Sequence, residues 1–190
     1  MKALHLEKKG IRLFALAESF HKEKLKSILS GVVMRKDLII DGIVFGRSTI
    51  GGNDSTDSIL TMVKHLNRND INLILLDGII ISMYNIIDGD KINNHTGLPV
   101  IAITFNDSFG INQSIKNYFP ENFALKLDQL LKSGKRDKIV LKTGKALWIR
   151  HWGIELFDSI RILDSFTIQG AIPEPIKIAK ILSRAYLATI

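Results

Sequence analysis

Three apolar segments close together in residues 11–45 constrain the fold of this chain more than any other feature. They are rich in Val, Ile, Leu and Phe, and we expect strands at Ile11 to Glu18, Leu25 to Met34 and Leu38 to Phe45. Turn signals for the last connection lie at Lys36-Asp37 or at Asp41-Gly42. Consecutive strands with such short connections pair antiparallel, so the sequence predicts an antiparallel block at the N-terminal end.

Beyond Gly51-Gly52, the pattern changes to alternating helices and strands. A helix with one apolar face follows residues 54–57, because Ile59, Met62, Val63 and Leu66 recur at helical spacing. Further elements are predicted in the order strand, helix, strand, at Ile71 to Leu76, Asp88 to His95 and Pro99 to Phe105. Such alternation implies parallel strands joined by right-handed crossovers, so the sequence predicts an α/β fold with a mixed sheet.

The C-terminal third predicts three more helices and a hairpin. The expected ranges are a helix at Pro120 to Leu131, hairpin strands at Ile139 to Leu141 and Ala146 to Trp152, a helix at Ile154 to Leu163, and a last helix from Pro173-Glu174-Pro175 to about Leu187. No internal repeat or low-complexity linker divides the chain. We therefore expect a single domain over residues 1–190.

Composition excludes several classes of protein. The chain has no cysteine, which removes disulfides and thiolate chemistry and fits a reducing compartment. No apolar run reaches the length of a membrane span, and the polar start does not resemble a signal peptide, so we expect a cytoplasmic protein without membrane contact. The net charge of +7 is compatible with nucleic-acid binding, although many basic proteins bind none.

Carboxylates from separate elements are the candidates for chemistry. Asp77 directly follows a buried strand, where a charge is costly unless it is paired or binds a metal. Asp54 stands at the start of a helix and Glu18 at the end of the first strand. Together the three could hold Mg²⁺ or Mn²⁺ for phosphodiester hydrolysis, with Asp77 and Asp54 as metal ligands. The alternatives are a turn aspartate at Asp77 and a helix cap at Asp54.

Other residues suit contact with nucleic acid. Tyr84 and Asn85 could stack on and hydrogen-bond an extruded base, although core packing of Tyr84 is the simpler interpretation. Trp148 and Trp152 share one face of a strand, which suits base stacking, but a half-buried edge hairpin or the contact of a homodimer explains it equally well. The last helix carries a basic face, which is commonly only solvated, formed by Lys177, Lys180 and Arg184.

Four stretches together resemble a known family. The order of elements is similar to the ribonuclease H-like fold, and residues 170–179 (GAIPEPIKIA) resemble the C-terminal signature of endonuclease V and its relatives. Residues 51–56 (GGNDST), 75–79 (LLDGI), and 84–88 (YNIID) with 96–101 (TGLPVI) resemble a mainly archaeal uncharacterised family of those relatives. The resemblance covers almost the whole chain and implies an endonuclease V-like fold.

The resemblance also implies where a metal site would be. Endonuclease V cleaves beside deaminated bases with a strand aspartate, an acid near the first helix, an aspartate ending the fourth strand and a late histidine or aspartate. Asp77 matches the third position and Asp54 most nearly the second. The first falls at Ala17 and the last at Lys180, and neither side chain can bind a cation. Lys180 could instead contact a phosphate or pair with Asp77.

These observations lead to one expected function and one alternative. We expect a nucleic-acid-associated protein, binding DNA or RNA, with a degraded divalent-metal phosphodiesterase site and at most weak endonuclease activity. Glu18 would assist Asp77 and Asp54 only if its strand bulges or ends there, because neighbouring residues of a strand point to opposite faces. The alternative is a non-catalytic nucleic-acid-binding or protein-assembly module. Hydrolysis of a small phosphorylated metabolite is a third, weaker hypothesis.

Overall fold

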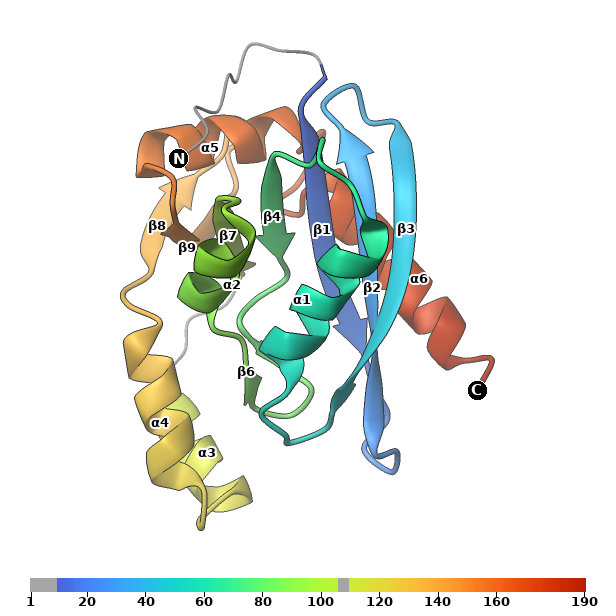
Figure 1. Ribbon diagram of the computed structural model, residues 1–190. Helices are drawn as coiled ribbons and strands as arrows, with labels where there is room; N and C mark the ends of the chain where they lie inside the picture. Colours follow the sequence, from blue (N-terminus) through green and yellow to red (C-terminus); the bar gives the residue numbers. More distant parts are fainter. Residues whose placement is uncertain (1–9, 106–109) are drawn as a thin grey trace.

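A seven-stranded mixed sheet forms the centre of the molecule (Figure 1). The computed structural model describes residues 10–105 and 110–190. In spatial order the strands are β3 (Ile40–Thr49), β2 (Lys26–Arg35), β1 (Arg12–Ser19), β4 (Leu73–Leu76), β7 (Val100–Thr104), β9 (Ala146–Trp152) and β8 (Asp137–Val140). β1, β4 and β7 run parallel, and the remaining neighbours pair antiparallel. The predicted mixed sheet, antiparallel first and then parallel, is confirmed.

Helices cover both faces of this sheet. The described helices are α1 (Ser55–Leu66), α2 (Gly89–Thr96), α3 (Ile111–Tyr118), α4 (Phe123–Lys132), α5 (Leu156–Ser165) and α6 (Glu174–Leu187). Figure 1 shows α1 and α2 in front of the sheet and α6 behind it, with α3 and α4 at the end toward which β1 and β4 point. None of the helices in the described ranges combines the length and apolar character needed to cross a bilayer.

The alternation of side chains along each strand produces two cores. Phe14 and Leu16 of β1 face α1 and α2, and their core includes Ile59 and Ile92 from those helices. Leu13, Ala15 and Ala17 face the other way, into a core that contains residues of α5 and α6. The central strand residues in both cores are almost completely buried. Burial on both faces explains why the sequences of these strands are continuous apolar runs.

Three elements were absent from the sequence-based prediction. A short hairpin, β5 (Ile80–Ile81) and β6 (Asn85–Ile86), follows β4, and α3 precedes the helix that was predicted to begin at Pro120. The helix α3 has Ile111, Ile115 and Tyr118 at helical spacing, but it is only eight residues long and buries only Ile115, and this short pattern was overlooked. Other elements lie within a few residues of their predicted ranges. Between β2 and β3 the turn uses Lys36-Asp37, since Asp41-Gly42 lies inside β3.

Close approach of β1 and β2 depends on Gly31. A methyl group at this position would overlap the ring of Phe14, which is completely buried. We expect Gly31→Ala to lower the free energy of unfolding by about 2 kcal/mol, as overpacked cores do. Urea denaturation would measure this loss against Gly10→Ala, where the added methyl group meets no atom within 4 Å. Equal stability of the two variants would contradict the steric argument.

Candidate functional site

The carboxyl ends of the parallel strands β4 and β7 open into a pocket. Ligands of open α/β sheets characteristically bind outside these strand ends. The pocket encloses about 540 Å³ and is closed on one side by the start of α3. We call it the site pocket. Its walls are mainly apolar, and among its polar lining residues are Asp77, Tyr84, Asn112, Arg136 and Arg150.

Asp77 lines this pocket and forms an ion pair with Lys180. The Lys180 Nζ atom lies 2.7 Å from Asp77 Oδ2 and 3.0 Å from Oδ1, although the two residues are 103 positions apart in the chain. The side chain of Asp77 is 15% exposed and that of Lys180 27% exposed. The pairing of Lys180 with Asp77, one of the two roles expected for this lysine, is therefore present. The pair neutralises the only carboxylate among the described lining residues of the pocket.

Ala17 and Glu18 lie on opposite faces of β1. The register of β1 with β2 runs without a bulge through Glu18 and Ser19, so the strand continues past both residues. Ala17 belongs to the core beneath α6, the same side from which Lys180 reaches Asp77. Glu18 turns toward the β5–β6 hairpin and accepts hydrogen bonds of 2.9 Å from the Ser82 amide and hydroxyl. The strand therefore does not bring Glu18 into the place of the missing acid.

The environment of Glu18 gives its carboxyl an unusual pKa. Burial raises the pKa, the Asp77 charge adds to the rise, and the Ser82 hydrogen bonds oppose it. A raised pKa means that the folded protein binds this proton more tightly than the unfolded chain. The stabilising effect is present below about pH 4.3, the ordinary glutamate pKa, and is lost as pH rises through the folded value.

We therefore expect Glu18→Gln to gain stability relative to the native protein as pH increases. The glutamine amide keeps the shape of the side chain and carries no charge at any pH. Urea denaturation from about pH 4 to about pH 7 would measure the difference, which should grow toward neutral pH. Glu23→Gln, a change at an exposed side chain, controls for the loss of surface charge. A difference that shrinks with pH would contradict the raised pKa.

Asp54 belongs to a separate network at the start of α1. Its carboxylate accepts hydrogen bonds from the Thr49 amide and hydroxyl at 2.9 and 2.6 Å, from Asn85 Nδ2 at 2.8 Å and from the Ser48 hydroxyl at 3.0 Å. Burial alone would raise the pKa of Asp54, but these donors lower it well below the ordinary range. Lys26 adds an ion pair at 3.3 Å. Asp54 thus fixes the loop before α1, and it does not line the site pocket.

The β5–β6 hairpin supplies Tyr84 to the pocket from a strained turn. Ser82, Met83 and Tyr84 have φ values of 44°, 59° and 65°, a conformation that costs about 1 kcal/mol or more for each residue with a side chain. Glu18 holds the first of the three, and the Gly51 amide donates a 2.7 Å hydrogen bond to the Ser82 carbonyl. The turn is therefore fixed by contacts from outside the hairpin.

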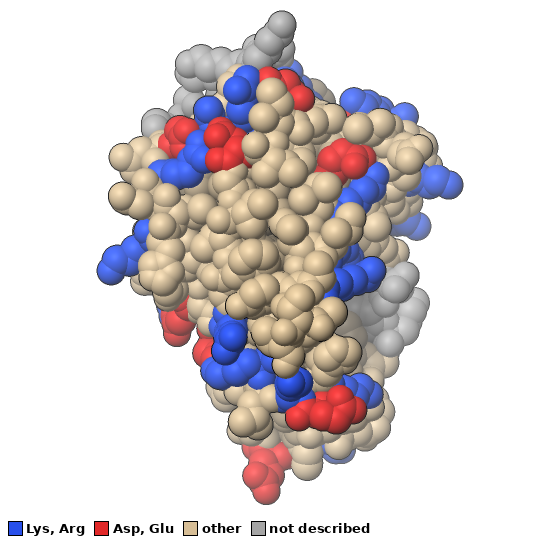
Figure 2. Space-filling view, turned by 90° about the vertical axis from the view of Figure 1, so that its right-hand side faces the viewer, with Lys and Arg blue, Asp and Glu red and all other residues tan. Residues whose placement is uncertain are grey.

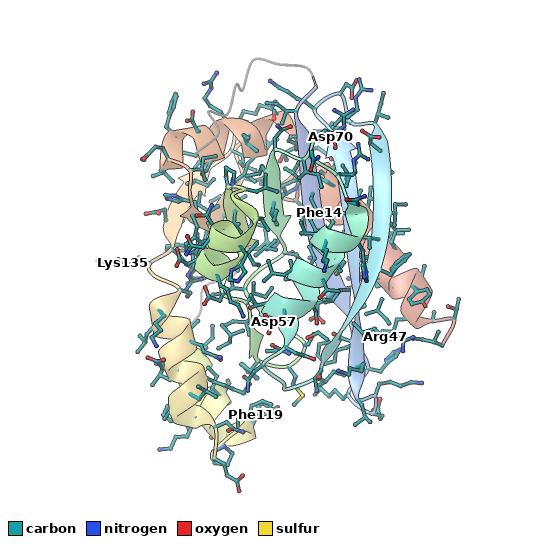
Figure 3. The ribbon with its side chains drawn as sticks, in the orientation of Figure 1. Phe14, Arg47, Asp57, Asp70, Phe119 and Lys135 are labelled. Atoms are coloured by element: carbon teal, nitrogen blue, oxygen red, sulfur yellow. The ribbon has the colours of Figure 1, made fainter. Side chains whose placement is uncertain are left out.

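A buried lysine of α4 completes this support. Lys126 has no exposed surface, and its Nζ atom donates to the carbonyls of Gly51, Gly52 and Tyr84 at 2.9–3.1 Å. It also lies 4.8 Å from the ring centre of Phe119, which Figure 3 shows at the end of the molecule opposite Asp70. Burial lowers the pKa of Lys126. This ammonium group ties α4 to the loop before α1 and to the hairpin tip.

Two arginines border the pocket on the side of β9. Arg136 stacks over the ring of Trp148 at 5.0 Å and donates to the Thr104 hydroxyl at 3.3 Å. Arg150 donates from Nε to the Gly134 carbonyl at 3.0 Å. Burial and the neighbouring Arg136 charge lower the pKa of Arg150 to about 10. The pocket therefore combines an ion pair at one end with two guanidinium groups at the other.

The remaining predicted contact residues have different surroundings. Tyr84 lines the pocket, with its ring centre 6.0 Å from that of Tyr118. Asn85 is completely buried and its amide bonds to Asp54, Ser48 and the Thr49 carbonyl, so it is not available to a base while that network is intact. Lys177 pairs with Glu174 at 2.5 Å, and Arg184 lies exposed on α6.

Sequence reasoning missed Lys126, Ser82, Arg136 and Arg150. Arg150 had a detectable signal, because it lies between Trp148 and Trp152 and shares their strand face by alternation. Lys126 had none, since a lysine in an amphipathic helix is ordinarily solvated. Its role arises from the loops that fold over it.

The three predicted acids, Asp77, Glu18 and Asp54, are not arranged to bind one divalent ion. In the described ranges, no three carboxylate or imidazole side chains come together as a metal site. Asp77 is paired with Lys180, Glu18 is bound to Ser82, and Asp54 is bound by several neutral donors and by Lys26. The site pocket is instead suited to binding an elongated ligand, with an apolar wall for a ring and guanidinium groups for oxygen atoms.

Comparisons with known proteins find similarity over nearly the entire chain. A family model described as endonuclease dU matches residues 9–187. A UPF0215 protein of Pyrobaculum calidifontis is 33% identical over 178 residues, covering 92% of this chain and 97% of the relative. Among solved structures, a protein of unknown function from Archaeoglobus fulgidus has a TM-score of 0.81 at 22% identity, covering 93% of this chain and 98% of that one.

Endonuclease V of Ciona intestinalis is a more distant structural neighbour. Its crystal structure contains a 24mer DNA with an inosine followed by a ribo-adenosine. The TM-score is 0.62 at 16% identity, and the match covers 95% of this chain and 87% of that one. At this identity the likeness establishes the endonuclease V-like fold.

Proposed function

Since the chain belongs to the endonuclease dU family, we propose that it binds a nucleic-acid strand at the site pocket and cleaves it weakly or not at all. The ion pair between Lys180 and Asp77 carries this proposal. The ammonium group, 2.7 Å from one oxygen of the carboxylate and 3.0 Å from the other, neutralises Asp77 and repels a divalent cation. The fold and the net charge of +7 support binding of a nucleic-acid strand. Ala17 and Lys180 argue against efficient metal-dependent cleavage, since neither side chain can bind a cation.

The choice between weak cleavage and pure binding depends on whether Lys180 can leave Asp77. If a divalent ion displaces it, Asp77 becomes the first ligand, and Mg²⁺ or Mn²⁺ would support slow hydrolysis. If not, the protein is the non-catalytic alternative, a binding module that has kept the fold. The completely buried Ala17 favours the second outcome, because it leaves the pair without a further carboxylate on that face.

A binding and cleavage experiment separates these outcomes. Single strands of DNA and RNA that contain one uracil, one hypoxanthine or neither would be titrated and followed by fluorescence anisotropy. We expect affinity to fall steeply from about 50 to about 200 mM salt, as phosphate contacts require. Absence of binding at low salt would overturn the proposal.

Cleavage of the same strands would be measured with Mg²⁺, Mn²⁺ or EDTA, beside an endonuclease V as reference. We expect at most slow, metal-dependent cleavage that Asp77→Ala abolishes. Cleavage at the reference rate would overturn the proposed degraded site. Cleavage that survives Asp77→Ala would place the activity elsewhere in the molecule.

A homodimer remains a separate proposal. Apolar side chains of β3 and α6 are exposed, including Ile43 (46%), Phe45 (40%) and Ile181 (60%). Figure 2 looks at the molecule from the side of β3 and shows a broad area without Lys, Arg, Asp or Glu, bordered above and below by both. Sedimentation equilibrium of the native protein and Phe45→Lys would test this surface, since a dimer through β3 should dissociate in the variant.

A further inference from the structure

Arg150 is a partly buried charge without a counterion in the described part of the chain. Its only described hydrogen bond runs from Nε to the Gly134 carbonyl, and no carboxylate in the described ranges lies within ion-pair distance. The charged guanidinium group of Arg150 has lost part of its hydration. A protein ordinarily offsets such a cost with a paired anion.

The neighbouring charge of Arg136 increases the free-energy cost of partly burying the Arg150 guanidinium group. Both guanidinium groups line the same pocket, and the like charge of Arg136 contributes to the lowered pKa of Arg150. Arg136 is held over Trp148 and by Thr104, so it is fixed on the rim beside Arg150. Two adjacent cations that converge on one cavity are stabilised by an anion that bridges them.

The charge and shape of the rest of the pocket narrow the class of ligand. Asp77 is paired with Lys180, so no described lining residue of the pocket offers a carboxylate that balances the charge of Arg150. Between Asp77 and the arginines the wall consists of apolar side chains, among them Ile79, Ile103 and Leu130, with the ring of Tyr84 beside them. A volume of about 540 Å³ is sufficient for a ring system with a charged group attached.

We propose that Arg150, assisted by Arg136, binds the phosphate group of a nucleotide whose base enters the apolar part of the site pocket. The inference deepens the proposed function, on which it rests, by assigning the phosphate contact to Arg150 of β9 and to Arg136, the residue before β8. The planar fork of a guanidinium group matches two phosphate oxygens, and a terminal phosphate and a phosphodiester share this chemistry. A base carbonyl would use the same donors but carries no charge to balance them.

The first experiment uses a small ligand and needs no strand. Calorimetry would compare deoxyuridine 5′-monophosphate with deoxyuridine as ligands of the native protein. We expect the nucleotide to bind about tenfold more tightly, because one charge-assisted contact is worth about 1.4 kcal/mol or more. Arg150→Met should abolish this preference, whereas Lys145→Met, a change at an exposed lysine of the β8–β9 turn, should leave it unchanged.

The second experiment uses a single strand with one uracil and places a neutral methylphosphonate at the linkage beside it. The native protein should bind the modified strand about tenfold more weakly, and Arg150→Met should not distinguish the two strands. The variant should also lower the salt slope by about 0.7, the value for one phosphate on a single strand. Arg150→Lys, which keeps the charge without the fork, should give an intermediate result. Thermal unfolding would confirm that each variant is folded.

The outcomes of the two experiments distinguish failure of the arginine assignment from failure of the proposed function. If the native protein binds strands and Arg150→Met behaves like Lys145→Met in both experiments, the arginine assignment is overturned and the proposed function stands. If Arg150→Met loses only the preference for uracil over cytosine at an unchanged salt slope, the contact is to the base and the phosphate assignment is overturned. If no strand binds but the nucleotide preference depends on Arg150, the inference stands without the proposed function. If neither ligand binds, both are overturned.

Discussion

Replacing Lys126 with methionine is expected to lower the free energy of unfolding by about 3 kcal/mol. The substitution retains the length of the side chain and removes its ammonium group, which leaves the partly buried carbonyls of Gly51, Gly52 and Tyr84 without their donor. Buried groups that lose a charged partner cost about 1–3 kcal/mol each, and recovery of the desolvation cost of the charge offsets part of the sum. For a domain of 190 residues the midpoint of thermal unfolding should fall by about 6–12 °C.

The same helix provides the matched control. Lys132 lies in α4 like Lys126, but its side chain is 75% exposed and its one ion pair, with Asp128, is an ordinary surface pair. Lys132→Met should change stability by less than about 0.5 kcal/mol. Equal melting temperatures for the two variants would show that Lys126 contributes no net stability.

A second measurement separates local from global effects. The strained tip at Ser82 to Tyr84 depends on contacts from outside the hairpin, and Lys126 provides one of them. Limited proteolysis should therefore cut Lys126→Met near Met83 under conditions in which the native protein and Lys132→Met resist. A cut confined to the region of Met83 would show that Lys126 holds the hairpin tip locally, because global unfolding exposes sites throughout the chain.

The order of elements could be predicted from the sequence, whereas the support of the β5–β6 hairpin by Glu18 and Lys126 could not. Apolar runs such as Leu73–Leu76 are buried on both faces, so composition alone identifies them as strands. The β5–β6 hairpin has Ser-Met-Tyr at its tip, none of which favours positive φ, so no turn signal was present. Its conformation results from Glu18 and Lys126, which lie 64 residues before Ser82 and 42 residues after Tyr84. Contacts of this separation have no local pattern.

Only part of the candidate site was predicted from the sequence. The position of Asp77 at a strand end followed from the apolar run before it. Its pairing with Lys180 was one of two roles proposed for that lysine, the other being contact with a phosphate. The proposed convergence of Asp54 and Glu18 with Asp77 depended on side-chain directions, which the strand register decides. Because β1 continues without a bulge, Glu18 points away from the face that Ala17 occupies. A single residue of register therefore determines whether an acid serves the site or the neighbouring hairpin.

The largest change in metal response is expected from Ala17→Asp combined with Lys180→Asp. The two substitutions place carboxylates on the face of the sheet where Asp77 lies and remove the ammonium group that now neutralises it. Without metal, the variant should lose about 3 kcal/mol or more, because Ala17 is 1% exposed and a buried carboxylate without a partner is costly. Mn²⁺ should restore about 2.7 kcal/mol at a concentration of one hundred times its dissociation constant.

Thermal unfolding with increasing Mn²⁺ would measure this recovery as a rise of about 5–10 °C. Ala17→Asn with Lys180→Asn is the matched control, since the amides impose the same crowding near α6 but bind divalent ions poorly. Lys180→Asp alone, which leaves the packed position of Ala17 intact, keeps the test informative if the double variant does not fold.

In the native protein, the melting temperature should not respond to Mn²⁺ beyond the effect of ionic strength, because the ammonium group of Lys180 occupies the side of Asp77 that a cation would need. A saturable rise in the native protein that Asp77→Ala abolishes would show that Lys180 yields its place to a metal. The ion pair would then be a resting state of the site rather than its replacement, and the weak-cleavage form of the proposal would be favoured over pure binding.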